Sequence, residues 1–173
     1  MMTRKHTILS LLCIFACYSC VSFAFEMSSS EFYNQDIMPT INTCDGRDIS
    51  PDIHWQGTPS KTASFALILS DLDAPSGVFY HWIVFNIPAN INAFPAAIAS
   101  LPAGTLLGKT SWGVSGYKGP CPPKGQSHRY VFSLYALNTM LSLPADSEAP
   151  VLLAAMQNHI LGEADLKVTY ERK

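Results

Sequence analysis

One stretch of the chain carries a large apolar side chain at every second position and then meets a proline. Phe65, Leu67 and Leu69 follow this period of two, which places them on one face of a β-strand. The same alternation puts Asp71 on that apolar face, and Pro75 ends the strand because it has no N–H to donate. A buried carboxylate is costly without partners, so we expect Asp71 at the rim of a hydrophobic core.

A second expected strand, 79–87, also begins an apolar face with an ionisable residue. In it His81 shares a face with Ile83 and Phe85 by the same alternation, while Trp82 takes the other face. We therefore expect His81 at the rim of a core as well.

A third expected strand, 128–135, repeats the arrangement, because His128 begins a face that continues with Tyr130 and further apolar residues. Asp71, His81 and His128 are therefore candidates for one site at the ends of three strands. The alternative is that they are unrelated polar residues at three separate strand ends.

The remaining elements predict a mainly β protein, an antiparallel β sandwich with long loops. Shorter strands are expected at 53–55 and 166–170 and within 105–116, and a long connection at 88–102. One helix is expected over 148–161, with Ser147 as its N-cap and Gly162 as its stop.

The first 24 residues are typical of a secretory signal peptide. Arg4 and Lys5 precede the apolar run 8–21, and a small residue stands at Ala24, after which we expect cleavage. The alternative is a retained anchor, although 14 residues are short for a bilayer span of roughly 20 residues. We expect a single domain over 25–173, exported to the periplasm or secreted.

The charge of that domain argues against some partners. It keeps nine basic and 13 acidic residues, a net charge of −4, with no basic run. Nothing in this pattern favours nucleic acid or an anionic membrane.

Two cysteines remain after the expected cleavage, because Cys13, Cys17 and Cys20 lie within the signal segment. Cys44 and Cys121 would be in an oxidising compartment, where a disulfide between them is one outcome. Two separate thiols in unrelated places are the other.

The loop before His128 is rich in residues that restrict the backbone. Three prolines stand at four consecutive positions between Gly119 and Gly125. Because proline fixes φ, we expect a rigid, shaped loop of the kind that forms a pocket wall.

Together these segments resemble the phosphatidylethanolamine-binding protein family, also called Raf kinase inhibitor-like, and in particular its bacterial branch. The segments are Asp71-Leu72-Asp73-Ala74-Pro75, His81-Trp82, Gly119-Pro120-Cys121-Pro122-Pro123-Lys124-Gly125 and His128-Arg129-Tyr130. The resemblance covers nearly the whole expected domain, from Cys44-Asp45-Gly46 to Arg172.

The resemblance implies a β sandwich with a small anion pocket at one end of the strands, which would bind phosphate-like anions or phospholipid head groups. The implied ligand-binding residues are Asp71, Ala74, Pro75, His81, Gly119, Cys121, Pro122, His128 and Tyr130. Asp73 and Arg129 fit a supporting ion pair. No metal, cofactor or catalytic residue is implied, whereas a protein partner and a homodimer are compatible with the family.

Because the chain ends soon after Tyr170, we expect no counterpart of the C-terminal helix that borders the pocket in eukaryotic members. The pocket would be more open as a result, and the kinase-inhibitor name does not transfer.

Two other functions compete with anion binding. A metal-assisted hydrolase would use Asp71, Asp73, His81 and His128, which are residue types of metal and acid/base sites. No motif of a known hydrolase site accompanies them. A protease inhibitor would need an exposed loop, for which the connection 88–102 is the candidate.

The expected pocket has a charge problem, because carboxylates repel an incoming anion. A protonated histidine would offset them, and a neighbouring carboxylate raises a histidine pKa. We therefore expect anion affinity to rise as pH falls from about 8 to about 6.

Overall fold

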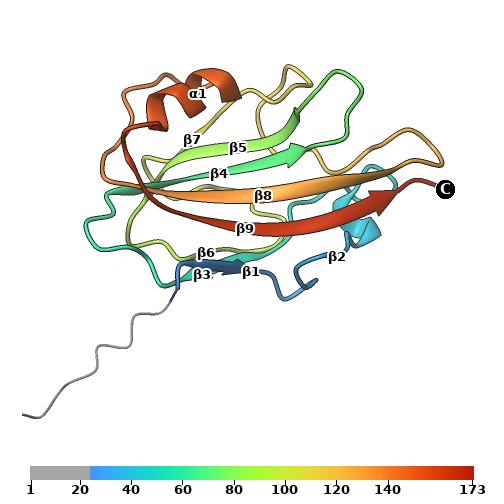
Figure 1. Ribbon diagram of the computed structural model, residues 1–173, viewed down its shortest axis with the longest axis horizontal. Coiled ribbons are helices and arrows are strands. Elements are labelled where there is room, and N and C mark those ends of the chain that lie inside the picture. The colour runs from blue at the N-terminus through green and yellow to red at the C-terminus, as the bar shows by residue number, and fades with distance from the viewer. Residues whose placement is uncertain (1–23) are drawn as a thin grey trace, which may run out of the picture.

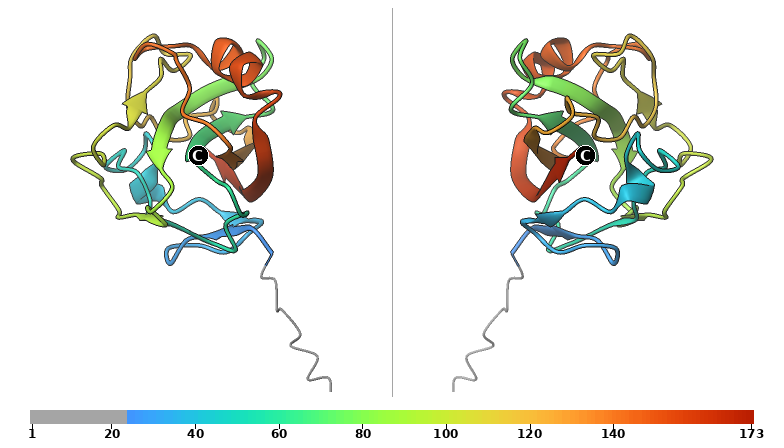
Figure 2. Two further views of the ribbon diagram at one scale, coloured as in Figure 1. Left: turned by 90° about the vertical axis from the view of Figure 1, so that its left-hand side faces the viewer. Right: turned by 90° about the vertical axis from the view of Figure 1, so that its right-hand side faces the viewer.

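The computed structural model describes residues 24–173 as two stacked β-sheets, an α-helix and long loops (Figures 1 and 2). The expected signal segment 1–24 therefore lies outside the described residues, apart from Ala24. Within 24–173, no helix has the length and apolar character needed to cross a membrane.

The larger sheet has six strands, and the smaller sheet has three. The order in the larger sheet is β2 (Asp36–Ile37), β9 (Ile160–Glu171), β8 (Ser127–Leu137), β4 (Ser64–Asp71), β5 (Phe79–Pro88) and β7 (Leu106–Leu107). The order in the smaller sheet is β1 (Glu26–Ser28), β3 (Ile53–Gln56) and β6 (Ala93–Phe94). Every pairing is antiparallel except that of β2 with β9. The mainly antiparallel sandwich expected from the sequence is confirmed.

The two faces of the larger sheet are covered differently. One face packs on the smaller sheet, and the other lies under helix α1 (Ala149–Met156), as Figure 1 shows. Phe65, Leu67 and Leu69 are fully buried between the sheets, which is the face that the alternation predicts. A 3-10 turn, η1 (Thr40–Asn42), follows β2 in the chain.

A bulge in β5 changes which face His81 occupies. Leu69 pairs with Trp82 and Ser70 pairs with Tyr80, so His81 has no partner across β4. Trp82 therefore points into the core between the sheets, and the His81 ring packs against Tyr130 on that same side, with ring centroids 5.4 Å apart.

The expectation that His81 shares a face with Ile83 and Phe85 is therefore wrong. Those two residues pack on the helix side of the sheet. An extra residue in one strand reverses the alternation from that point on, which a period of two cannot anticipate.

The helix is shorter than the expected 148–161, and its ends differ. Ser147 does not cap it, because the Ser147 hydroxyl donates to the Pro144 carbonyl, and the N-cap position belongs to Glu148. Gly162 does not stop it either, because Gly162 lies within β9 and pairs with Ala136.

The residues that the helical pattern assigned to 160–161 instead extend the last strand, which runs over 160–171 rather than 166–170. Pairing with eleven-residue β8 along this length outweighs the local helical preference. The strand within 105–116 is limited to two residues, and the connection 88–102 contains β6.

Candidate functional site

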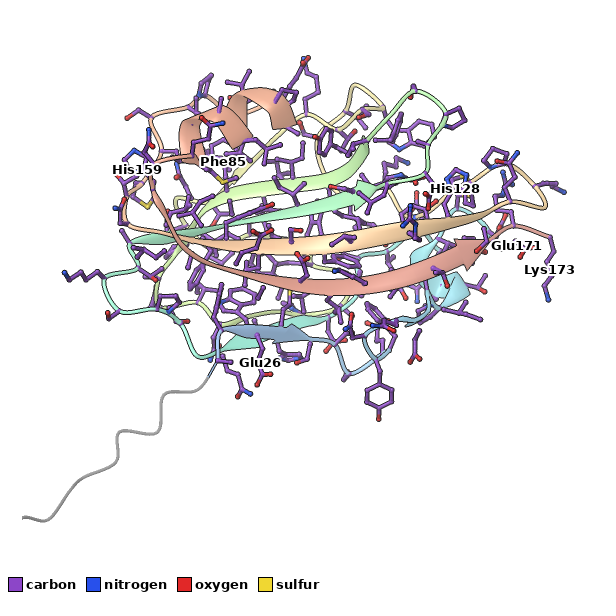
Figure 3. All side chains as sticks on the ribbon, in the orientation of Figure 1. Glu26, Phe85, His128, His159, Glu171 and Lys173 are labelled. Carbon is purple, nitrogen blue, oxygen red and sulfur yellow. A yellow bond between two sulfur atoms is a disulfide. The ribbon has the colours of Figure 1, made fainter. Side chains whose placement is uncertain are left out.

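Three strand ends meet at one end of the larger sheet, because neighbouring strands are antiparallel. Asp71, the last residue of β4, lies opposite Phe79 of β5 and Tyr130 of β8. Figure 3 shows His128 at this end, with the C-terminal end of β9 nearby, whereas His159 lies at the opposite end. Strand register, together with the bulge in β5, thus brings the candidate residues from three segments to one end of the sheet.

A small cavity of about 180 Å³ opens at these strand ends. Its walls are Asp71, Ala74, Pro75, Ser76, Phe79, His81, Trp112, Cys121, Pro122, Pro123 and His128. We call it the strand-end pocket. Of the implied ligand-binding residues, only Gly119 and Tyr130 lie behind this surface rather than in it.

A buried pair links β4 to β8 in the pocket wall. The Asp71 Oδ2 atom lies 2.8 Å from Nδ1 of His128, and both side chains are almost fully buried. The other oxygen, Oδ1, accepts a hydrogen bond from the Asp73 backbone N–H at 2.9 Å. Both oxygens of Asp71 are therefore occupied by partners of the protein itself.

The second histidine is held by the backbone of the loop that precedes the proline cluster. Nδ1 of His81 lies 2.8 Å from the Lys118 carbonyl oxygen and 3.1 Å from that of Gly119. Carbonyl oxygens only accept, so Nδ1 of His81 carries the proton.

Burial lowers the pKa of His81, although the two carbonyl contacts and the Asp71 charge act in the opposite direction. The neutral ring is therefore favoured at His81, in contrast to the raised pKa that a neighbouring carboxylate would give alone.

The two histidines share one consequence of these contacts. In each, an acceptor fixes the N–H at Nδ1, and no hydrogen bond forms to Nε2 within residues 24–173. A neutral ring then presents Nε2 as an acceptor, and only a protonated ring can donate from it. Proton uptake would convert the two ring edges from acceptors into donors.

The loop that holds His81 is fastened to a second segment. Cys121 forms a disulfide with Cys44, with Cα atoms 5.4 Å apart, which decides between the two outcomes that the sequence left open. The Cys44 N–H also donates to the Pro120 carbonyl at 3.2 Å. A side chain at Gly119 would approach the Asn42 carbonyl oxygen to 2.1 Å, so only glycine fits this close approach.

Tyr130 lies against both histidine rings and has a free polar group. Its ring centroid is 5.4 Å from that of His81 and 6.5 Å from that of His128. The hydroxyl is buried and has no hydrogen-bond partner within residues 24–173. Burial, and next the charge of Asp71, raise the pKa of Tyr130, so the hydroxyl keeps its proton. A buried O–H without a partner is a group that a bound ligand or water can satisfy.

Asp73 and Arg129 form an exposed pair beside the pocket. Nη2 and Nε of Arg129 donate to the two carboxylate oxygens at 2.6 Å and 2.9 Å, and the Arg129 backbone N–H donates at 2.8 Å. These hydrogen bonds lower the pKa of Asp73 to about 2. Neither residue lines the pocket, and the pair joins the loop after β4 to the start of β8.

Four lining residues were not expected from the sequence: Ser76, Phe79, Trp112 and Pro123. Phe79 packs edge-on against Trp112 with centroids 5.0 Å apart, and the Trp112 ring lies 6.1 Å from that of His81. Trp112 is about half exposed, at 49 %. Phe79 could have been found, because it stands two residues before His81. Trp112 comes from a glycine-rich segment with no pattern of its own.

Within residues 24–173, no group of three or more His, Cys, Asp or Glu side chains is arranged to hold a metal ion. A second histidine–aspartate contact, His54 with Asp52, lies on the smaller sheet and outside the strand-end pocket.

Comparison with known proteins gives consistent matches along the chain. Residues 28–171 match the family model described as phosphatidylethanolamine-binding protein. A UPF0098 protein of Methanothermobacter thermautotrophicus is 42% identical over 150 residues, which cover 85% of this chain and 99% of the relative. The UPF0098 protein YbcL of Escherichia coli is 34% identical over 183 residues, covering 98% of this chain and all of the relative.

Two solved structures share the fold. The crystal structure of E. coli YbcL, described as a new member of the mammalian PEBP family, has a TM-score of 0.82 at 31% identity. It covers 86% of this chain and 99% of that chain. A PEBP homolog from Chlamydia trachomatis, CT736, has a TM-score of 0.81 at 33% identity, covering 87% of this chain and 99% of that chain.

Proposed function

Because this chain belongs to the phosphatidylethanolamine-binding protein family, we propose that its strand-end pocket binds a small phosphate-like anion, free or as a phospholipid head group. Binding, rather than catalysis, is the proposed activity. The observation that carries the proposal is the fixed Nδ1–H form of His81 and His128, which leaves both Nε2 atoms without a hydrogen-bond partner among residues 24–173.

The charge of Asp71 does not argue against this function. Its two oxygens accept hydrogen bonds from the Asp73 N–H and from Nδ1 of His128, so they are not directed at a ligand. A protonated His128 would form a charge-assisted hydrogen bond to Asp71 on one side and to an anion on the other.

The size of the pocket supports a small group. About 180 Å³ holds a tetrahedral oxyanion but not a whole lipid, so a lipid would place only its head group inside. The exposed ring of Trp112 at the rim would contact the organic substituent of such a head group. We therefore expect a phosphate monoester to bind more tightly than inorganic phosphate.

Calorimetric titration with sulfate at pH 8 and pH 6 tests the proposal, because sulfate keeps its charge over this range whereas phosphate does not. We expect tighter binding at pH 6, with proton uptake that shows as a dependence of the heat on the buffer. Titration with phosphoethanolamine and with phosphate separates a head group from a free anion. Equal sulfate affinity at the two pH values would contradict the role of the histidines.

Export and partners belong to the same proposal. We propose that the mature domain acts in the periplasm or outside the cell, and the disulfide between Cys44 and Cys121 supports an oxidising compartment. A regulatory effect on a protein partner and a homodimer are compatible with an exposed pocket. Size-exclusion chromatography with light scattering checks the homodimer.

A further inference from the structure

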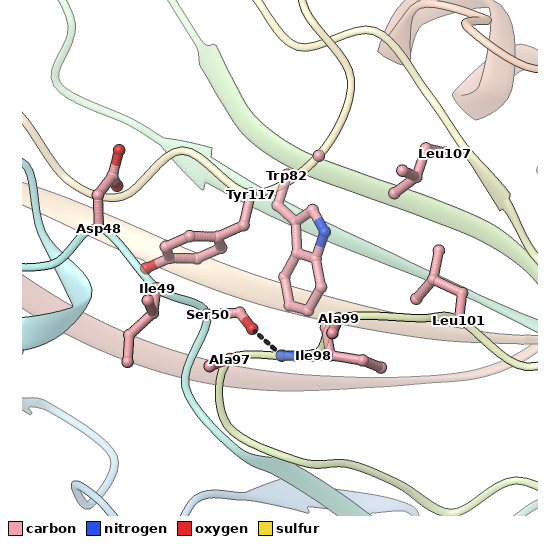
Figure 4. Close-up of a pocket in the computed structure, with 11 residues that line it drawn as sticks. Asp48, Ile49, Ser50, Trp82, Ala97, Ile98, Ala99, Leu101, Leu107 and Tyr117 are labelled. Atoms are coloured by element: carbon pink, nitrogen blue, oxygen red, sulfur yellow. Dashed lines mark hydrogen bonds between the residues drawn. The ribbon is translucent and has the colours of Figure 1, made fainter.

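A second cavity lies on the other side of the loop that holds His81. It has a volume of about 430 Å³, within the range of small-molecule sites, and its walls are mostly apolar. We call it the Trp82 groove, after the residue at its centre. Figure 4 shows Asp48 at one end, beyond the Tyr117 ring, and Leu101 and Leu107 at the other end.

The groove has a charged end and an apolar end. Leu101 and Leu107 are only partly buried, so their side chains are accessible to a ligand. Trp82 and Tyr117 form the middle, with ring centroids 5.4 Å apart in an edge-to-face contact. Tyr117 is neutral, because burial raises its pKa well above the usual range and its hydroxyl donates to the Asn42 carbonyl.

Asp48 is thus the charged side chain among the lining residues, and its position is fixed. Its Oδ1 accepts a 2.6 Å hydrogen bond from the Gly119 N–H, and its φ of 54° is in the left-handed region. The Lys118 ammonium lies 3.4 Å from Oδ2, but the Lys118 side chain is half exposed and is outside the groove. Such exposed contacts contribute little, so a ligand cation can replace Lys118.

The opposite wall of the groove is also held in an uncommon conformation. Ala97 has a φ of 51°, which alanine rarely adopts because its Cβ meets the following carbonyl. The Ala97 N–H donates to the Ser50 carbonyl at 2.8 Å, and the Ile98 N–H donates to the Ser50 hydroxyl at 3.2 Å. Backbone strain of this kind persists where the surroundings enforce it, and it is frequent at ligand sites.

From these observations we propose that the Trp82 groove binds a small hydrophobic ammonium compound, separately from the anion of the strand-end pocket. The ammonium group pairs with the Asp48 carboxylate and lies against the electron-rich Tyr117 ring. The hydrocarbon body packs on the partly exposed Leu101 and Leu107, beside the edge of the buried Trp82 ring. An anionic ligand of the same shape is disfavoured, because it places a second negative charge at Asp48.

Three probes with a phenyl group on a four-carbon chain test the charge preference: 4-phenylbutylamine, 4-phenylbutanol and 4-phenylbutyrate. Binding is followed at neutral pH by two-dimensional NMR of the mature domain, with the indole N–H of Trp82 as the reporter. We expect the amine to bind most tightly, the alcohol roughly threefold more weakly, and the carboxylate most weakly. Equal affinities, or tighter binding of the carboxylate, would overturn the proposal.

Asp48→Asn removes the charge while it keeps an oxygen for the Gly119 N–H and tolerance for positive φ. We expect the amine to lose its advantage over the alcohol in this variant. Asp146→Asn is the matched control, because Asp146 also has positive φ and a side-chain hydrogen bond but lies outside the groove. Unchanged amine binding in Asp48→Asn contradicts the proposal, as do shifts centred on Trp112. If Asp48→Asn does not fold, the probe series on the unmodified domain still decides.

Discussion

Two histidine–aspartate contacts in this protein have similar lengths but different surroundings. On the smaller sheet, Nε2 of His54 lies 2.6 Å from Asp52, and the His54 side chain is 53% exposed. At the strand ends of the larger sheet, Nδ1 of His128 lies 2.8 Å from Asp71, and the His128 side chain is 4% exposed. Of the two contacts, only the one between His128 and Asp71 lies in the wall of the strand-end pocket.

The difference shows that such a contact marks a candidate site only in combination with burial and a free ring nitrogen. Asp52 also accepts hydrogen bonds from the Ser29 hydroxyl and the Ser30 N–H, so that pair fastens a turn to β3. His54 adds an exposed partner to a carboxylate that is already satisfied. At the strand ends, Asp71 instead fixes the tautomer of His128 and leaves Nε2 for a ligand.

The largest expected effect comes from the disulfide between Cys44 and Cys121 beside the strand-end pocket. Within residues 24–173, the smaller sheet has no such covalent link. Replacement of Cys44 and Cys121 by serine opens a loop with a sequence separation of 77 residues. We expect a loss of about 4 kcal/mol in the free energy of unfolding on the chain-entropy model, measured in guanidinium chloride. Sulfate affinity should fall as well, because Cys121 and its neighbours form a pocket wall. A loss below about 1 kcal/mol would contradict the chain-entropy account of this disulfide.

Next in size is the removal of the histidine from each pair. His128→Ala leaves the buried Asp71 without its partner, and we expect a loss of about 3 kcal/mol together with at least tenfold weaker sulfate binding. His54→Ala is the matched control, with a loss within about 0.5 kcal/mol and unchanged sulfate affinity, because His54 is exposed. Urea unfolding and calorimetry measure both quantities. Similar effects of the two substitutions would remove the distinction between the pairs.

A smaller effect concerns the pH dependence of stability. Burial lowers the pKa of His81, so the unfolded chain takes up a proton near pH 6.5 while the folded protein does so only at lower pH. The free energy of unfolding should therefore fall as pH falls below about 6.5 and through the lower pKa of folded His81. His81→Gln should reduce this slope, and His54→Gln should not. Urea unfolding at pH 7.5, 6.5 and 5.5 gives the slopes, and sulfate should reduce the loss at acidic pH.

The smallest effect is expected at the exposed pair beside the pocket. Arg129→Ala removes the side-chain hydrogen bonds that hold the pKa of Asp73 at about 2, so that pKa should rise toward the usual value of about 4. Stability should change by no more than about 1 kcal/mol, because the pair is exposed. Carbon NMR of the Asp73 carboxyl group follows the titration. A loss of sulfate binding comparable to that of His128→Ala would place Arg129 among the ligand contacts.

Strand alternation was sufficient to predict much of the fold and of the site. It placed Asp71 and His128 at the rim of one face, and the register of β4 against β8 brings them together. It failed at His81, because a one-residue bulge in β5 reverses the faces. His81 reaches the same pocket as Asp71 and His128 only because of this bulge. The three residues do lie together, but the face that alternation assigned to His81 was the wrong one.

Other features depend on contacts between distant segments and leave no periodic signal. The helical spacing near Met156 is real, but β9 begins at Ile160 because β8 offers a long partner strand. The contribution of Trp112 to the pocket arises from its packing on Phe79. The Trp82 groove likewise forms where the connection 88–102 passes the loop before Gly119. From the sequence, that connection was considered only as a protease-inhibitor loop, because no pattern in it marks the wall of a cavity.

The central claim is that an anion binds in the strand-end pocket when Nε2 of a pocket histidine acquires a proton. Nitrogen NMR of the imidazole rings at pH 6.5 tests this directly, because it distinguishes protonated from unprotonated ring nitrogens. Of the two pocket histidines, His81 and His128, we predict that His81 without ligand carries a proton at Nδ1 and none at Nε2, because burial lowers its pKa. Saturation with sulfate should protonate Nε2 of at least one of them and leave His54 unaffected. If both Nε2 atoms remain unprotonated with sulfate bound, the claim is wrong.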